Sequence, residues 1–176
     1  MEFVVLDAGA GSPHDRNLTT VRPAISMKLP HETWPTSSIL LVLFGASLLA
    51  VGSYFLVLRP PLLPEDLRFV GVSQAQLEAV APRLAPWLTY VFRVLGGDIS
   101  ATGILAMALA ATSYRSHHSS AGVAAALAGL ISIGLMAGVN FAIDSDFKWE
   151  LLGLAILWAC STLAFIAEKF GIRTGR

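Results

Sequence analysis

The feature that most constrains this chain is a run of 22 residues, Ser37–Leu58, that contains no charged side chain. At a rise of about 1.5 Å per residue, a helix of this length crosses the roughly 30 Å hydrocarbon core of a bilayer. Three more apolar runs follow, at roughly Trp87–Tyr114, Ala121–Ile143 and Trp149–Ala167. The sequence therefore predicts an all-α fold, a four-helix transmembrane bundle within a membrane domain at residues 37–170.

The composition supports this interpretation. The chain is 55% hydrophobic and 14% charged, whereas soluble domains contain about 25% charged residues. Equal numbers of basic and acidic residues, 12 of each, give no argument for a nucleic-acid partner. The single cysteine, Cys160, excludes an intrachain disulfide and a multi-cysteine metal motif. We expect a protein of the lipid bilayer, with no metal and no cofactor.

Two segments outside the apolar runs have a recognisable character. Residues 1–36 are polar and rich in glycine and proline, which predicts an extramembrane N-terminal arm, either loosely ordered or docked on a neighbouring subunit. The arm lacks the apolar core of a signal peptide. Between the first two spans, Ser73 and Gln76 form a capping-box pattern before a short amphipathic helix, which we expect to lie at the membrane interface. Residues 171–176 form a short tail.

The charges near the helix ends bear on the orientation. Four spans place both termini on the same side of the membrane. The basic residues expected on that side are Arg22, Lys28, Arg115, Lys169, Arg173 and Arg176. Those expected on the other side are Arg59, Arg68, Arg83 and Lys148. The small excess favours cytoplasmic termini, and the localisation we expect is a bacterial inner membrane.

Polar residues inside the apolar runs need a physical reason. Spans two and three run in opposite directions, so the start of span two and the end of span three lie at the same end of the bundle. The polar cluster expected there comprises Arg93, Gly96, Gly97, Asp98, Asn140 and Asp144. A lone charge within the bilayer costs roughly 2.5 to 3.5 kcal/mol on insertion scales, which favours pairing of Arg93 with Asp144, or of either with Asp98. Arg93 and Asp98 are five residues apart and do not share a helix face, so we expect the pairing to cross between helices.

Three interpretations of this cluster stay open. It is a stabilising ion pair, a polar pocket or proton-accepting site, or a place where Arg93 extends to the membrane surface. The adjacent glycines, Gly96 and Gly97, allow close packing against span three, or leave room for a lipid, a quinone or another flat ligand.

Small residues predict where the helices approach one another closely. The glycines assigned to helix packing are Gly45, Gly52, Gly122, Gly134 and Gly138. Gly134 and Gly138 form a GxxxG motif, which is typical of helix contact rather than of chemistry. His117 and His118 are adjacent in a turn, and we interpret them as solvated rather than as metal or pigment ligands.

Part of the chain resembles a group of uncharacterised bacterial membrane proteins with four helices. The resemblance rests on Glu65–Gly71 (EDLRFVG), Pro82–Pro86 (PRLAP) and Arg93–Gly97 (RVLGG), which agree with that group's pattern in order and spacing. The pattern often has His-Asp before the arginine, where this chain has Val91 and Phe92. The resemblance implies four membrane helices and no established activity.

These observations lead to three functional hypotheses. The first is a non-catalytic structural or accessory subunit of a larger membrane complex, partnered by other membrane subunits or by self-association. The alternative is a small-molecule or lipid binder or transporter with a pocket near Arg93 and Asp98. The third is a membrane enzyme that uses a buried acid, Asp98 or Asp144.

Overall fold

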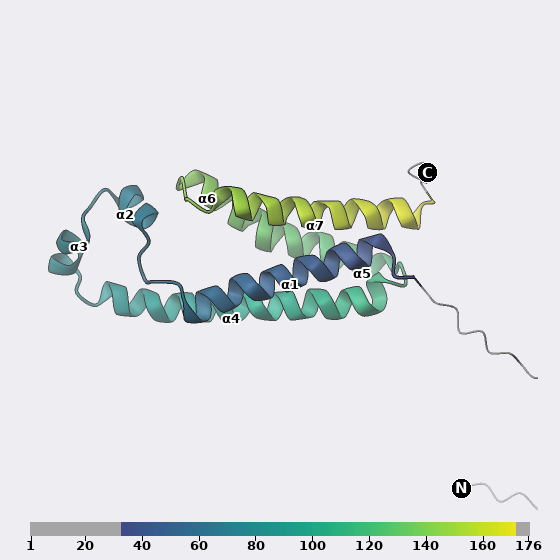
Figure 1. The fold of residues 1–176 in the computed structure, drawn as a ribbon, viewed down its shortest axis with the longest axis horizontal. Helices are drawn as coiled ribbons and strands as arrows, with labels where there is room; N and C mark the ends of the chain where they lie inside the picture. Colours follow the sequence, from purple (N-terminus) through teal and green to yellow (C-terminus); the bar gives the residue numbers. More distant parts are fainter. Residues whose placement is uncertain (1–32, 172–176) are drawn as a thin grey trace, which may run out of the picture. The chain divides into compact units, whose positions relative to one another are not determined.

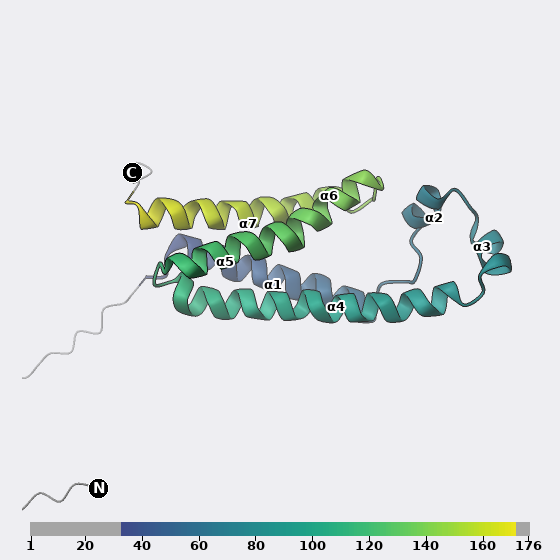
Figure 2. The ribbon, with the colours of Figure 1, turned by 180° about the vertical axis from the view of Figure 1, so that it is seen from behind.

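The computed structural model describes residues 33–171, and the ribbon is shown in Figures 1 and 2. The expected N-terminal arm up to residue 32, with its docking role, and the tail beyond Gly171 lie outside the described residues. Within these residues, four helical stretches are long and apolar enough to cross a membrane: Thr36–Val57, Leu84–Tyr114, Ser119–Ala142 and Lys148–Lys169. The expected all-α fold with four spans is therefore confirmed, and the chain has the character of an integral membrane protein.

The first span is a single helix, α1 (Thr36–Val57), that begins directly after Pro35. It ends just before Arg59 and the proline pair Pro60-Pro61, which cannot continue a helix because proline lacks the backbone N–H. Its buried side chains, Leu41, Phe44 and Leu48, recur at the spacing of one helix face.

Two short helices connect the first and second spans. The predicted helix is α3 (Gln74–Val80), and its capping box is confirmed: Gln76 N donates to Ser73 Oγ over 3.2 Å, and Ser73 N donates to Gln76 Oε1 over 2.8 Å. Helix α2 (Pro64–Val70) was not predicted from the sequence; it begins on a proline and ends at Gly71, which has a φ of 77°. Only glycine adopts this left-handed conformation without strain.

The second span consists of α4 (Leu84–Leu109) followed by η1 (Ala110–Tyr114), in which the backbone leaves helical geometry at Thr112, with a φ of −117° and a ψ of −108°. The helix begins before Pro86 rather than after it, because the first turn of a helix needs no backbone donor at that position. Figures 1 and 2 show the start of α4 projecting past the end of α1 towards α3. The guanidinium of Arg59 lies 3.4 Å from the centre of the Phe92 ring. Phe92 therefore marks the level at which α1 ends.

The third span is interrupted, whereas the fourth is continuous. Helix α5 (Ser119–Gly129), the π-helical turn η2 (Leu130–Gly134) and α6 (Leu135–Ala142) form the third span. A turn that contains Asp144, with a φ of 52°, leads into α7 (Lys148–Lys169). Helix α1 lies between α4 and α7, and the third span packs on α7.

Two reciprocal pairs of glycines hold α1 against α4. A Cβ atom built on Gly96 would lie 2.8 Å from Gly52 O, and one built on Gly52 would lie 2.7 Å from Gly96 O. Seven residues along each helix, Gly45 and Gly103 form the same contact, with 2.7 Å between a Cβ on Gly45 and Gly103 O. The two backbones are therefore in direct contact, which allows dense van der Waals packing without bulky side chains.

Glycines also shape the contact between the third span and α7. The Phe165 ring occupies the space where a Cβ on Gly122 would lie, and the Trp158 ring occupies that of Gly129. Trp158 Nε1 also donates to the carbonyl oxygen of Ala125 over 3.0 Å. This hydrogen bond satisfies the indole N–H inside the bundle, where water is not available.

Candidate functional site

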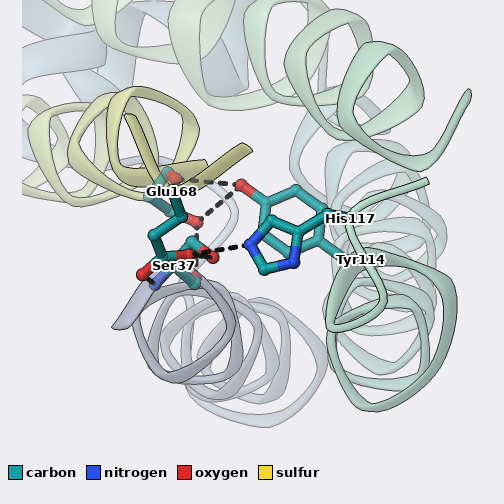
Figure 3. Close-up of polar contacts among 5 residues, drawn as sticks. Ser37, Tyr114, His117 and Glu168 are labelled. Atoms are coloured by element: carbon teal, nitrogen blue, oxygen red, sulfur yellow. Dashed lines mark hydrogen bonds and ion pairs between the residues drawn. The ribbon is translucent and has the colours of Figure 1, made fainter. Parts of the chain in front are cut away.

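One polar cluster forms where the first turn of α1, the segment after α4 and the last turn of α7 meet (Figure 3). Its members are Ser37, Tyr114, His117, Ser161 and Glu168. Ser37 and Glu168 are 131 positions apart in the chain, yet their side chains are in direct contact. We call these five residues the terminal junction.

Glu168 is the centre of the terminal junction. Its Oε1 accepts a hydrogen bond from the backbone N–H of Ser37 over 3.1 Å, and its Oε2 accepts one from the Ser37 hydroxyl. The first N–H groups of a helix have no partner within the helix and carry a partial positive charge. Glu168 therefore caps α1 from another helix, and it replaces the side-chain cap that Pro35 cannot provide.

Tyr114 extends the terminal junction into the core. Its hydroxyl donates to the backbone oxygen of Ser161 over 2.9 Å and lies 3.1 Å from Ser161 Oγ. Ser161 Oγ in turn donates to the backbone oxygen of Ser37 over 2.9 Å. Tyr114, Ser161 and Ser37 are each 0% exposed. The chain of hydrogen bonds thus satisfies polar groups that have no access to water.

His117 closes the outer side of the terminal junction. Its Nε2 atom lies 3.2 Å from Glu168 Oε2, and the two side chains are 29% and 27% exposed. The imidazole stacks on the ring of Phe165, with 5.4 Å between the ring centres. His117 adopts a φ of 55°, so the turn between the second and third spans places it there at a backbone cost.

The arrangement of these groups indicates a structural joint. In a nucleophilic triad the histidine lies between the serine and the acid. Here the Glu168 carboxylate lies between Ser37 and His117, and Ser37 is fully buried, so no substrate reaches its hydroxyl. The contacts connect the first, second and fourth spans at one end of the bundle.

A Tyr114→Phe variant tests the inner part of the terminal junction. We expect the free energy of unfolding to fall by about 1 kcal/mol, because the variant loses the hydrogen bonds of the hydroxyl. The ring packing on Phe165, with 4.4 Å between the ring centres, is retained. Reversible unfolding in mixed detergent micelles, followed by circular dichroism, measures this change. Tyr90→Phe is the matched control, because Tyr90 is 66% exposed. Equal losses in both variants would contradict a specific role for the Tyr114 hydroxyl.

At the opposite end of the bundle, Arg59 is held between two phenylalanine rings and an acid. Its guanidinium lies 3.4 Å from the centre of the Phe92 ring and 5.2 Å from that of Phe55. It also pairs with Asp66 Oδ2 at 3.3 Å, and its side chain is 8% exposed. Burial lowers the pKa of Arg59 from its usual value, while the neighbouring Asp66 carboxylate opposes this change.

Helix α2 is attached to the turn that precedes α7. Ser145 Oγ donates to the buried carboxylate of Glu65 over 3.4 Å, and Arg68 pairs with Asp146 at 2.7 Å. The hydrogen bond to Asp146, together with the negative charge of that residue, stabilises the charged form of Arg68 and raises its pKa. These contacts are long-range in sequence, which explains why α2 is stable at only seven residues.

The structure separates the charged residues that the sequence analysis placed in one cluster. Arg93 and Asp98 are both exposed, and five residues of helix turn their side chains about 140° apart. Within residues 33–171 neither forms a hydrogen bond or ion pair through its side chain. Arg93 follows Phe92, so it lies at the level where α1 ends. Asp98 is six residues past Phe92 and therefore about 9 Å further into the span.

The other members of the expected cluster also differ from the expectation. Asp144 pairs with Lys148 and not with Arg93, and the hydrogen bond from Lys148 holds the pKa of Asp144 below its usual value. The side-chain amide of Asn140 donates to Met136 O in its own helix over 2.8 Å. Gly96 packs against α1 rather than against the third span, and Gly97 has open space where a Cβ would lie.

A shallow apolar hollow of about 540 Å³ lies near the start of α4, away from Arg93 and Asp98. Its lining residues are Ala81, Pro82, Arg83, Leu84 and Trp87. It contains no convergent polar groups that would orient a ligand. The hollow is a surface feature between the end of α3 and the projecting start of α4.

The segments that carry the resemblance have structural roles here. Asp66 Oδ2 accepts from the backbone N–H of Leu63 over 2.9 Å at the start of α2, Gly71 ends that helix, and Gly96 contacts α1. Comparison of the chain with protein-family models, with curated proteins and with solved structures finds no match.

Proposed function

We propose that this protein is a non-catalytic structural or accessory subunit of a larger membrane assembly. The observation that carries the proposal is the position of Asp98 on the surface of α4. The exposed side chains of the spans are mostly apolar, as a lipid-facing surface requires; examples are Leu43, Leu105, Leu127, Ile131 and Leu163. Among the charged residues on this surface of the described spans, Asp98 is the one that lies away from the span ends.

The depth of Asp98 separates it from the other charged residues of the described spans. Arg93 lies level with the end of α1, and Glu150 and Glu168 lie in the first and last turns of α7. Asp98 lies about 9 Å further in than Phe92, and its side chain is too short to reach the surface. An unpaired ionisable group at such a depth costs several kcal/mol, so such residues normally face a protein partner or a water-filled cavity.

The face of α4 that carries Asp98 points away from α1. Gly96 and Gly103 mark the side of α4 that contacts α1, and Asp98 lies on the far side. No described element of this chain covers it. A neighbouring membrane subunit on α4 would remove the cost of the exposed carboxyl group. The alternative of a ligand pocket shared by Arg93 and Asp98 has less support, because the two side chains diverge.

The test is the size of the native particle. The protein is extracted from its native membrane in a mild detergent and analysed by size-exclusion chromatography, light scattering and mass spectrometry. The proposal expects a particle larger than one chain, with constant stoichiometry across detergents of different chain length. A monodisperse particle that holds a single chain in each detergent would contradict it. An absorption spectrum of the same peak tests for a bound pigment or quinone.

A further inference from the structure

The outward face of α4 has a regular spacing. Exposed residues recur at alternating steps of four and three along the whole helix. They are Trp87, Val91, Val94, Asp98, Ala101, Leu105 and Ala108. This repeat of 3.5 residues is the seam of a left-handed helix pair, in which the a and d positions face a partner helix. We call these seven residues the α4 seam.

The side chains of the α4 seam suit close contact with another helix. Ala101 and Ala108 alternate with the larger Val94 and Leu105, and small residues at this spacing let two helix backbones approach closely. Beside the seam, a Cβ on Gly97 would have no atom within 4 Å, whereas the equivalent atom on Gly96 would touch α1. The backbone at Gly97 is thus accessible from outside the chain.

The chemistry of Asp98 restricts what can lie opposite it. Hydrocarbon favours the neutral form of a carboxyl group over the carboxylate. A neutral carboxyl group both donates and accepts a hydrogen bond, so its best partner does the same at the same depth. A two-fold axis along the membrane normal places every residue opposite its own copy at equal depth. Two Asp98 side chains related by such an axis would satisfy each other.

We propose that a second copy of this chain docks on the α4 seam, with the two α4 helices parallel and the two Asp98 side chains hydrogen-bonded to each other. The inference rests on the proposed function and names the partner in that assembly. Arg93 lies outside the seam, level with the end of α1, and a long basic side chain near the end of a span extends to the headgroup layer. The dimer therefore leaves no buried arginine without a partner.

The other open glycine surfaces have weaker arguments for a partner. On the third span, Gly138 has no atom within 4 Å of a built Cβ, and Gly134 is approached only by atoms of its own span. Asn140, the polar residue near them, is already bonded within its helix. Lipid can cover such a surface without leaving a polar group unbonded, whereas lipid chains offer no hydrogen-bond partner to the Asp98 carboxyl group.

Cysteine cross-linking tests which face meets the second copy. In a Cys160→Ser background, Ala101→Cys places a thiol in the α4 seam, and Leu163→Cys places one on α7, where the wild-type leucine is 64% exposed. Membranes are oxidised with copper phenanthroline, and dimers are quantified on non-reducing gels. We expect at least fivefold more disulfide-linked dimer from Ala101→Cys than from Leu163→Cys. Equal yields from the two positions would overturn the assignment of the seam.

Two substitutions of Asp98 test the hydrogen bond itself. Asparagine is self-complementary like the neutral acid, whereas leucine is accepted by lipid and has no polar group. Sedimentation equilibrium in density-matched detergent should show a dimer dissociation constant within about threefold of wild type for Asp98→Asn and at least tenfold weaker for Asp98→Leu. Circular dichroism checks that both variants fold. A dimer of unchanged affinity in Asp98→Leu would overturn the role of Asp98.

The outcomes separate this inference from the proposed function. A large native particle in which Ala101→Cys does not cross-link to itself overturns the second copy and leaves the accessory-subunit proposal standing. A single chain with no cross-link contradicts both. Self-cross-linking through the α4 seam that is weakened by Asp98→Leu supports the second copy, and it supports the accessory-subunit proposal as well when the native particle holds further subunits. A native particle of two copies alone supports the second copy and contradicts the accessory-subunit proposal.

Discussion

Gly96→Ala is expected to lower the free energy of unfolding by about 2 kcal/mol, while Gly97→Ala is expected to raise it by up to about 1 kcal/mol. Alanine favours a helix over glycine by about 1 kcal/mol at either position. At Gly96, however, the added Cβ would lie 2.8 Å from Gly52 O and 2.9 Å from Leu56 N. These are backbone atoms, so the clash is relieved only by separating α1 from α4, at a cost of about 3 kcal/mol.

Gly97 is the matched control because it is the next residue in the same helix and has nothing within 4 Å of a built Cβ. Unfolding is followed by circular dichroism in mixed micelles, at protein concentrations where the particle is monomeric, so that the α4 seam does not contribute. Gly52→Ala should behave like Gly96→Ala, because its Cβ would lie 2.7 Å from Gly96 O. Similar stabilities for the Gly96 and Gly97 variants would show that the two backbones are not in contact.

The sequence predicts the spans well because the bilayer imposes their length and composition. Each apolar run had to be helical to satisfy its backbone, and the end of α1 follows from Pro60 and Pro61. The capping box at Ser73 was also predictable, because both of its partners, Ser73 and Gln76, lie within three residues of each other. Helix α2 was not, because its stability comes from Glu65 and Arg68 meeting the turn before α7, about 80 residues away.

The predicted polar cluster failed to assemble for a reason that spacing does not reveal. Topology places the start of span two and the end of span three at the same end of the bundle, as Figure 1 shows, but within the described residues each charge there has a nearer partner or none. Asp144 binds Lys148, one helical turn away, and Arg59 binds Asp66. The rotation of α4 about its axis, set by Gly96 and Gly103 against α1, turns Asp98 outwards. That rotation depends on backbone contact, which a hydrophobic pattern does not specify.

The terminal junction could have been predicted from the directions of the spans, which determine the helix ends that meet at each end of the bundle. Ser37, Tyr114 and Glu168 lie at the start of span one, the end of span two and the end of span four, which all meet at one end of the bundle. The charged residues within the apolar runs, Arg93 and Asp98, lie towards the opposite end, and they therefore drew the prediction to that end. Residues in the first and last turns of helices resemble ordinary caps, so nothing in their local pattern indicated a shared network.

Glu168→Ala is expected to lower the free energy of unfolding by about 3 kcal/mol, whereas Glu168→Gln should lower it by about half as much. The alanine variant leaves the backbone N–H of Ser37 without an acceptor at a site that is 0% exposed, and a buried donor without a partner costs about 1 to 3 kcal/mol. Glutamine retains one carbonyl oxygen for this N–H but loses the charge that favours the first turn of a helix.

Glu150→Ala is the control at the other end of α7, where the exposed carboxylate only complements the helix dipole and its loss should cost at most about 1 kcal/mol. Hydrogen exchange of the peptide spanning residues 33–40 provides a local readout, since the first turn of α1 should exchange faster in Glu168→Ala. Equal losses of stability in Glu168→Ala and Glu168→Gln would contradict a role for the retained carbonyl as the acceptor.

The position of Glu168 explains why the effect should be large. An acid in the last turn of α7 opposes the dipole of its own helix, so it is unfavourable there in isolation. It becomes favourable only when the first turn of α1 lies opposite it. Glu168 therefore favours the assembled bundle over a separate α7, and removing it should loosen the contact between the first and fourth spans before it affects either helix.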